Sequence, residues 1–203
     1  MSLFSPLSRF GGWILDGSII GSFDASGFRR HAREFEDPQL AVDLSGRRCL
    51  VTGANSGLGY ATALDLARRG AQVWMLCRDR ERGQLALDKI CEESGSERVE
   101  LHQIDLSSIQ SIRRFADGMK DVPVHALIHN AGVLPAERQL TEDGLELCLA
   151  TNLVGPFLLT ALLWPRLARA ESPRIVHVSS GGMYTRKLDL RAIEGVHGRY
   201  DGV

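Results

Sequence analysis

One glycine-rich turn carries residue types that suit the binding of a phosphate. An apolar run at 49–51 leads into Thr52-Gly53-Ala54-Asn55-Ser56-Gly57-Leu58-Gly59, and an alanine- and leucine-rich stretch at 60–69 follows at once. A strand, a glycine turn and a helix in this order bring bare backbone N–H groups to a phosphate, and glycine leaves room for its approach. The spacing T-G-x-x-x-G-x-G is by itself equally typical of a structural turn. Its position between strand and helix favours a nucleotide site.

Polar or small residues also follow four other apolar runs, which we predict as strands at 72–77, 99–104, 124–129 and 174–178. The carboxyl ends of parallel strands lie at one edge of a sheet, where ligands of α/β proteins bind. Five such ends predict one long cleft suited to a dinucleotide. The residues at the four further ends are Cys77, Arg78, Asp105, Asn130, Ala131, Gly132, Ser179 and Ser180.

Arg78 lies 19 residues after Gly59, where a dinucleotide-binding fold selects its cofactor. An acidic side chain there accepts hydrogen bonds from a free ribose hydroxyl, whereas an arginine suits a 2′-phosphate. Cys77, at the strand tip, offers no carboxylate, so we expect NADP(H) in preference to NAD(H). Two alternatives stay open: Asp79 serves the ribose, or Arg78 is only a solvated charge at a helix start.

Asn152 and Ser180 are candidates for chemistry. Asn152 falls on an apolar stripe of a predicted helix at 144–164, in which Pro156 introduces a kink. A buried amide there is either a core group bonded to the kinked backbone or a group that holds a water at an active site. Ser180 is either a turn residue or a hydrogen-bond partner of a substrate oxygen.

Strands and helices alternate from residue 48 onward, and this alternation predicts an α/β fold, a Rossmann-type doubly wound parallel sheet. The first helix is expected to pack through Leu58, Ala61, Leu64 and Ala67, and Ser107 with Gln110 predicts a capping box for the third helix. We predict an N-terminal extension at 1–45 and a dinucleotide-binding domain at 46–203.

Composition excludes several classes of protein. The chain has 24 Lys and Arg against 25 Asp and Glu and no basic stripe, which argues against a nucleic-acid partner. Its 4 cysteines are scattered, which favours reduced thiols in an intracellular, cytoplasmic protein over disulfides, and no metal site is predicted. No apolar run matches a membrane span. We expect the aromatic arm at 1–45 to pack on its own domain, with contact to a membrane surface as the alternative.

Taken together, these motifs resemble the short-chain dehydrogenase/reductase family over 44–180. The resemblance rests on several ordered motifs: the turn at 52–59, Asp105-Leu106, Asn130-Ala131-Gly132, Asn152 and Val178-Ser179-Ser180. The segments Cys77-Arg78-Asp79 and 141–146 (T-E-D-G-L-E) are similar to the retinol-dehydrogenase-like branch of that family.

The resemblance implies hydride transfer between NADP(H) and a carbonyl or alcohol carbon of a small, lipophilic substrate. It implies that the turn at 52–59 holds the pyrophosphate and adenosine and that Asp105 and Leu106 border the adenine. Asn130, Ala131 and Gly132 would line the ribose. Asn152 and Ser180 match two members of the family's catalytic Asn-Ser-Tyr-Lys set, in which the Asn holds a water and the Ser orients the carbonyl oxygen.

The sequence departs from the family pattern at two places. His129 stands where the family usually has an Asn or an apolar residue. No Tyr after Ser180 has a Lys four residues on, because Lys187 follows Tyr184 by only three positions and no Lys follows Tyr200. We therefore expect the chain to be the cofactor half of a longer enzyme, with a sheet incomplete at its C-terminal edge. The alternatives are a non-catalytic dinucleotide-binding or partner-binding protein and a truncated chain that does not fold.

Overall fold

The computed structural model describes residues 28–29, 32 and 42–181. Of the predicted N-terminal arm at 1–45, all residues except 28–29, 32 and 42–45 lie outside the described residues, as do Tyr184, Lys187 and Tyr200. The chain divides into two units, and every strand and helix below belongs to the unit that contains Asp43–Ser179. Ser180 belongs to the other unit. The domain boundary at residue 45 stays a prediction.

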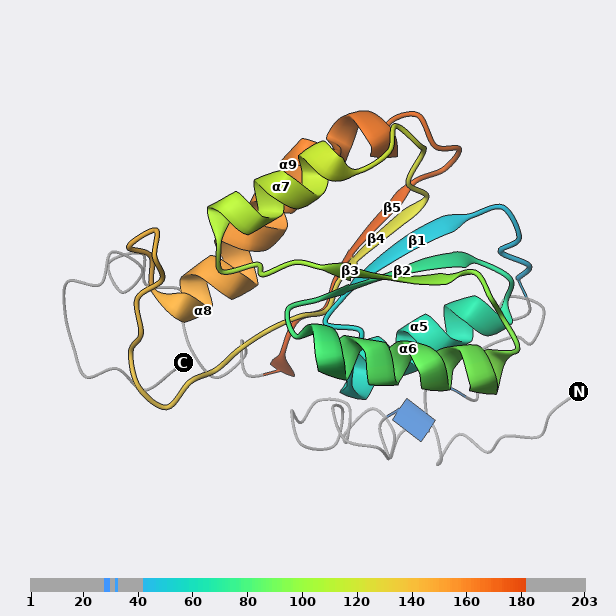
Figure 1. Ribbon diagram of the computed structural model, residues 1–203, viewed down its shortest axis with the longest axis horizontal. Helices are drawn as coiled ribbons and strands as arrows, with labels where there is room; N and C mark the ends of the chain where they lie inside the picture. The colour runs from blue at the N-terminus through green and yellow to red at the C-terminus, as the bar shows by residue number, and fades with distance from the viewer. Residues whose placement is uncertain (1–27, 30–31, 33–41, 182–203) are drawn as a thin grey trace, which may run out of the picture. The chain divides into compact units, whose positions relative to one another are not determined.

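Five parallel strands form one sheet in the order β3-β2-β1-β4-β5 (Figure 1). This order confirms the predicted Rossmann-type sheet. The order reverses between β1 and β4, which is the point where open α/β sheets bind ligands. The strands are β1 (Arg48–Thr52), β2 (Gln72–Cys77), β3 (Val99–Gln103), β4 (Ala126–His129) and β5 (Arg174–His177).

Helices cover both faces of the sheet (Figure 1). On one face lie α5 (Gly57–Arg68) and α6 (Arg80–Ser94). On the other lie α7 (Ile109–Gly118) and a second helical stretch made of α8 (Leu147–Leu149), a π-helical turn η2 (Ala150–Val154) and α9 (Gly155–Leu167). Each helix lies between two strands in the chain, so each strand is returned parallel to the last.

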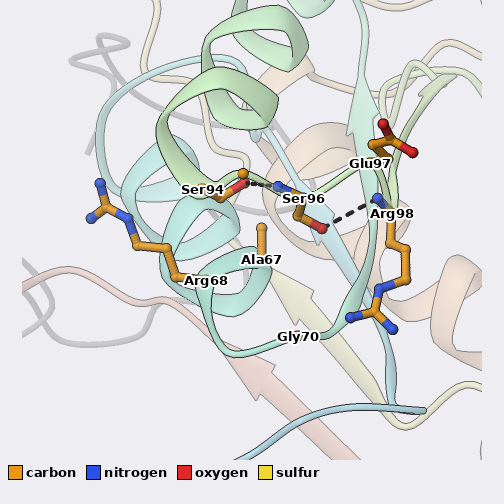
Figure 2. A pocket seen from close by; sticks show the side chains of 8 residues that line it. Ala67, Arg68, Gly70, Ser94, Ser96, Glu97 and Arg98 are labelled. Atoms are coloured by element: carbon orange, nitrogen blue, oxygen red, sulfur yellow. Dashed lines mark hydrogen bonds between the residues drawn. The ribbon is translucent and has the colours of Figure 1, made fainter.

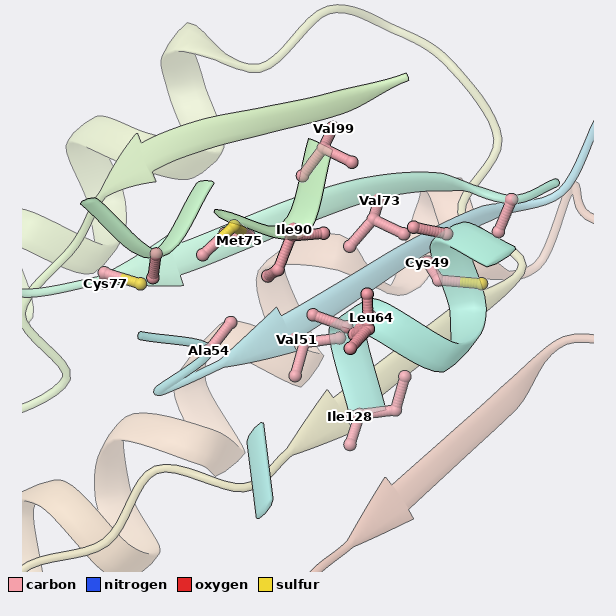
Figure 3. Packing of buried hydrophobic residues seen from close by; sticks show 14 residues of the cluster. Cys49, Val51, Ala54, Leu64, Val73, Met75, Cys77, Ile90, Val99 and Ile128 are labelled. Atoms are coloured by element: carbon pink, nitrogen blue, oxygen red, sulfur yellow. The ribbon is translucent and has the colours of Figure 1, made fainter. Parts of the chain in front are cut away.

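Alternate residues of the strands face the two helical layers, as expected for a pleated strand. In β1, Val51 packs with the α5 and α6 layer, whereas its neighbour Leu50 packs with the α7 and α9 layer. Figure 3 shows the first cluster, in which Val51, Val73 and Met75 meet Leu64 and Ile90. Because both faces of the central strands are buried, their sequences are continuous apolar runs.

The helix ends follow the capping rules with one correction. Asp79 caps α6 by accepting from the Arg82 N–H at 3.0 Å, and Gly95 ends it in the left-handed region. The third helix, α7, is capped by Ser108, which accepts from the Ser111 N–H at 3.2 Å. The predicted capping box at Ser107 is therefore wrong, because the helix begins at Ile109 and its N-cap is Ser108; the Ser107 hydroxyl donates to Asp105 Oδ1.

The buried face of α5 also differs from the prediction. Leu64 and Ala67 are buried as expected, but Leu58 and Ala61 are exposed. Gly59 and Ala63 take their places on the sheet. Since α5 begins at Gly57, its first turn lies at the edge of the sheet, and Leu58 is left 71% exposed beside the glycine turn.

The helical stretch Leu147–Leu167 has 21 residues and a mean hydropathy of 1.8 in its most apolar part. The expectation that no apolar run matches a membrane span was wrong, because length and composition alone allow this one to cross a membrane. Its composition has a simpler cause in the fold, since Leu159, Leu163 and Leu167 are fully buried against α7 and the sheet. Within this stretch, the exposed large apolar residues are Leu153, Phe157 and Trp164.

The irregularity of this helix lies where Pro156 was expected to kink it. The Gly155 N–H bonds to the Ala150 carbonyl, five residues earlier, and so closes a π turn directly before the proline. Proline has no N–H, so it cannot complete the α-helical bond to the Asn152 carbonyl. The π turn thus lies directly before a residue that cannot donate a backbone hydrogen bond.

Removing buried volume from α9 tests its place in the core. Leu163→Ala should lower the free energy of unfolding by about 2–5 kcal/mol, because Leu163 is fully buried. Leu153→Ala is the matched control: the same atoms are removed from a side chain that is 56% exposed, and the loss should stay below about 1 kcal/mol. Urea unfolding measures both, and equal losses would contradict this packing.

Candidate functional site

The glycine turn approaches the end of β4 so closely that two of its glycines, Gly53 and Gly59, leave no room for a larger side chain. Gly53 has φ +66°, and a Cβ there would lie 3.0 Å from the Ala131 Cα. A Cβ on Gly59 would collide with the Gly53 carbonyl and the Asn130 amide. Both glycines are therefore required to bring the ends of β1 and β4 together at the switch point of the sheet.

Thr52 fixes this junction from within. Its side chain is fully buried, and its Oγ1 accepts from the N–H groups of Asn130 and Ala131, both at 3.0 Å. The Asn130 amide donates in return to the Thr52 carbonyl at 3.0 Å. Thr52 and Asn130 are thus engaged with each other, so the structure assigns them to holding the turn. Gly132 follows exposed and Ala131 half-buried.

The first turn of α5 presents open backbone. Ser56 has extended backbone angles, and among the described side chains none makes a capping hydrogen bond there. Ser56 and Gly57 are exposed, Asn55 is half-buried, and a Cβ on Gly57 would meet nothing within 4 Å. The first N–H groups of a helix have no partner within the helix and favour an anion. This turn fits the pyrophosphate that the sequence predicts for it.

Residues 77–79 separate into three roles. Cys77 is buried, and burial raises the pKa of its thiol to about 11, so it is neutral. Asp79 caps α6 through its Oδ1 as described above, which favours the capping role over its alternative role at a ribose. Arg78 is exposed between them, and its backbone carbonyl accepts from Gln103 Nε2 at 3.1 Å. Arg78 therefore directly follows the carboxyl end of β2, as predicted.

Asp105 and Leu106 follow β3 at the same edge. Asp105 Oδ1 accepts from the Ser107 N–H at 2.8 Å and from the Ser107 hydroxyl at 2.6 Å. Leu106 is buried, and its carbonyl lies against Gly155, where a Cβ would collide with it. The segment predicted to border the adenine is thus in close contact with the end of the π turn.

Asn152 lies in that π turn and is exposed, so the prediction of a buried amide was wrong. The apolar stripe continues without it, since the wider π turn rotates the side chain off the buried face. The amide makes a two-point contact with one backbone residue: Oδ1 accepts from the Val133 N–H at 2.9 Å, and Nδ2 donates to the Val133 carbonyl at 2.9 Å. The side chain thereby fixes the loop after β4.

Ser180 follows β5 in the chain and is exposed. The described contacts within 43–179 bring together the glycine turn, the end of β4 and, through Val133, Asn152. Arg78 and Asp105 lie at the ends of β2 and β3 along the same edge of the sheet. The catalytic and cofactor roles of all these residues stay predictions.

His129 is a residue whose environment the sequence did not reveal. It is 4% exposed, its Nε2 lies 2.8 Å from the Thr160 hydroxyl of α9, and its ring stacks on His177 with centroids 4.6 Å apart. Among the described atoms its Nδ1 is buried without a hydrogen-bond partner. Burial and the neighbouring His177 lower the pKa of His129 to about 4, so it is neutral at neutral pH.

A hollow of about 460 Å³ lies at the other end of the sheet. It is lined by the last residues of α5 and α6 and by the loops that follow them, including Arg68, Gly70 and Arg98 (Figure 2). The Ser96 and Arg98 N–H groups bond to neighbouring serine hydroxyls within the same loop, at 3.2 Å each. These loops precede β2 and β3, so the hollow is at the amino ends of the strands and is not the predicted dinucleotide site.

Comparison with known families identifies a family that agrees with the glycine turn, the strand order and the polar strand ends described above. The family model described as short chain dehydrogenase matches residues 47–187. The chain belongs to the short-chain dehydrogenase family. Dehydrogenase/reductase SDR family member 12 of Bos taurus is 39% identical over 97% of this chain, and human retinol dehydrogenase 11 is 40% identical over 76% of it.

The present chain covers 62% of the length of the first of these relatives and 49% of the length of the second. A solved structure from Mycobacterium paratuberculosis is 39% identical with a TM-score of 0.69, over 79% of this chain and 56% of that one. A metagenomic short-chain oxidoreductase in complex with NADP is 32% identical with a TM-score of 0.60, over 68% and 64%. The fold predicted from the motifs is thus shared with solved members of the family.

A methyl group on Gly59 tests the close approach at the switch point. Gly59→Ala should lower the free energy of unfolding by about 2 kcal/mol or more, because the new Cβ collides with backbone and with Asn130. Gly118→Ala is the matched control, since a Cβ on this helical glycine meets nothing within 4 Å and should be neutral or stabilising by up to about 1 kcal/mol. Equal effects on urea unfolding would refute the close approach.

The buried His129 predicts acid lability. Its folded pKa of about 4 lies below the ordinary value of 6.5, so the unfolded chain binds the extra proton first. Stability from this group is complete above about pH 6.5 and is lost as the pH falls toward 4, by on the order of 3 kcal/mol. His129→Gln should flatten the curve of unfolding free energy against pH in that window. An unchanged slope would show that His129 does not titrate as described.

Proposed function

We propose that this chain forms the NADP(H)-binding part of a short-chain dehydrogenase/reductase that moves a hydride between the cofactor and a carbonyl or alcohol carbon. The observation that carries the cofactor preference is the arrangement at 77–79. Cys77 is buried and uncharged, and Asp79 is committed to the α6 cap at 3.0 Å, which leaves the exposed Arg78 at this strand end. A guanidinium beside a ribose favours a 2′-phosphate.

The residues present suit the cofactor. The α5 N-terminus, which no described side chain caps, offers its first N–H groups to the pyrophosphate, and the small residues Gly53, Gly57 and Gly59 leave room for it. Asp105 and Leu106 border the adenine, and Asn130, Ala131 and Gly132 line the ribose. When bound, the nicotinamide supplies the hydride chemistry, and the protein supplies position.

Asn152 and Ser180 are the proposed catalytic residues of this chain. Pro156 leaves the Asn152 carbonyl without its α-helical donor, so that oxygen can hold a water of the proton relay. Ser180 orients the substrate oxygen. Human retinol dehydrogenase 11 bears the name of a lipophilic alcohol. We propose that the substrate here is likewise a lipophilic alcohol or carbonyl compound.

Replacing Arg78 tests the cofactor proposal. Arg78→Ala should weaken NADPH binding about 10- to 100-fold, because a charge-assisted hydrogen bond to phosphate is worth about 1.5–3 kcal/mol. NADH binding should be nearly unchanged, since NADH lacks the 2′-phosphate. Titration calorimetry measures both affinities. Arg114→Ala removes the same charge from an exposed position on α7 and should leave both unchanged.

The two affinities together decide whether Arg78 selects the cofactor. Equal losses for NADPH and NADH, or none for either, would exclude Arg78 as the selective residue. Oxidation of NADPH by a panel of aldehydes and ketones then tests hydride transfer. Binding of NADPH without turnover in this chain would favour the alternative of a non-catalytic dinucleotide-binding protein.

A further inference from the structure

The segment that bears Asn152 is anchored at two separate points on the segment that follows β3. The first point is a hydrogen bond from the Ile109 N–H to Asp143 Oδ2, 2.9 Å long and 34 residues apart in the chain. The second is the contact of Gly155 with the Leu106 carbonyl, which leaves no room for a Cβ. Asn152 lies between these two anchors in sequence.

Asp143 belongs to a small folded turn. The Thr141 N–H bonds to the Leu145 carbonyl at 2.8 Å, and the Leu147 N–H bonds to the Gln139 carbonyl at 2.9 Å. Glu146 then caps α8 by accepting from the N–H groups of Cys148 and Leu149, both at 2.9 Å. A rigid turn therefore passes directly into the helical stretch that contains Asn152, so a displacement of Asp143 is transmitted to that stretch.

The Asp143 carboxylate meets the start of α7, where an anion is favoured by the unpaired N–H groups and by the helix dipole. Ser108 supplies the local cap of the same helix, at the Ser111 N–H. The helix thus has two side-chain acceptors in its first turn. One comes from its own N-cap, and the other comes from the turn that leads to Asn152.

We infer that Asp143 is a positioning residue, which holds the π turn bearing Asn152 in place against the segment 105–109. This inference assigns a role to Asp143, one of the acidic residues of the 141–146 motif, which the nucleotide site itself does not use. For the reaction it rests on the proposed function, because Asn152 is one of the residues proposed to be catalytic. The geometric part of the inference needs no cofactor.

Hydrogen exchange of the cofactor-free chain tests that part. The Val133 N–H bonds to Asn152 Oδ1, so its protection reports directly on the position of the Asn152 side chain. In Asp143→Ala we expect exchange at Val133 and Leu147 to accelerate by about tenfold, because local opening becomes easier. Asp143→Asn keeps an acceptor oxygen and should restore most of the protection.

Ser108→Ala is the matched control. It also removes one acceptor from the first turn of α7, but it leaves the Asp143 anchor in place. Both alanine variants should lose similar thermal stability, whereas only Asp143→Ala should expose Val133. Unchanged Val133 exchange in Asp143→Ala, or equal acceleration in both variants, would overturn the positioning role.

A second measurement addresses the reaction. If the chain turns over NADPH, Asp143→Ala should lower kcat about tenfold with little change in the NADPH dissociation constant, since misplacement of a catalytic group affects the chemical step. Ser108→Ala should retain kcat. Accelerated exchange with unchanged kcat would confine Asp143 to the geometry and separate it from catalysis. Failure of NADPH to bind would count against the proposed function alone.

Discussion

The close approach of β1 and β4 is the constraint on which the rest of the site depends. Two glycines make it sterically possible, and the buried Thr52 hydroxyl holds it by accepting two backbone N–H groups at 3.0 Å. A buried hydroxyl with satisfied partners is stabilising, whereas the same N–H groups without an acceptor would each cost free energy. The junction fixes where the phosphate turn lies relative to the loop that follows β4.

From this junction the geometry extends to the helix beyond β4 through a short series of contacts. Val133 lies in the loop after β4. The Asn152 amide accepts from its N–H and donates to its carbonyl. His129 adds a second connection, because its Nε2 reaches Thr160 of α9 from the last residue of β4. The exposed Asn152 amide and the buried His129 ring thus join the end of β4 and the loop after it to η2 and α9.

The departures from the sequence predictions share a physical cause. Leu58 and Asn152 were assigned to buried faces on the assumption of a regular helix of known start. The α5 helix starts at the rim of the sheet, and the π turn before Pro156 changes the angle between successive side chains. The cap lies one residue later than predicted, at Ser108, and the Ser107 hydroxyl donates to Asp105 Oδ1 at 2.6 Å. A local sequence pattern does not decide which of two neighbouring serines caps a helix, because each has several hydrogen-bond partners within reach.

Sequence alone determined the sheet, its parallel order and the family, because buried parallel strands are continuous apolar runs and because the phosphate turn needs glycine at fixed positions. It also placed Thr52, Arg78, Asp105 and Asn130 at strand ends. Only the tertiary structure decided which of these side chains are free to meet a ligand. Asp79 and Thr52 are engaged by hydrogen bonds, whereas Arg78 is exposed, and such partnerships depend on chain segments far apart in sequence. Because they too depend on distant segments, the bond between Ile109 and Asp143 and the burial of His129 were not predicted from the sequence.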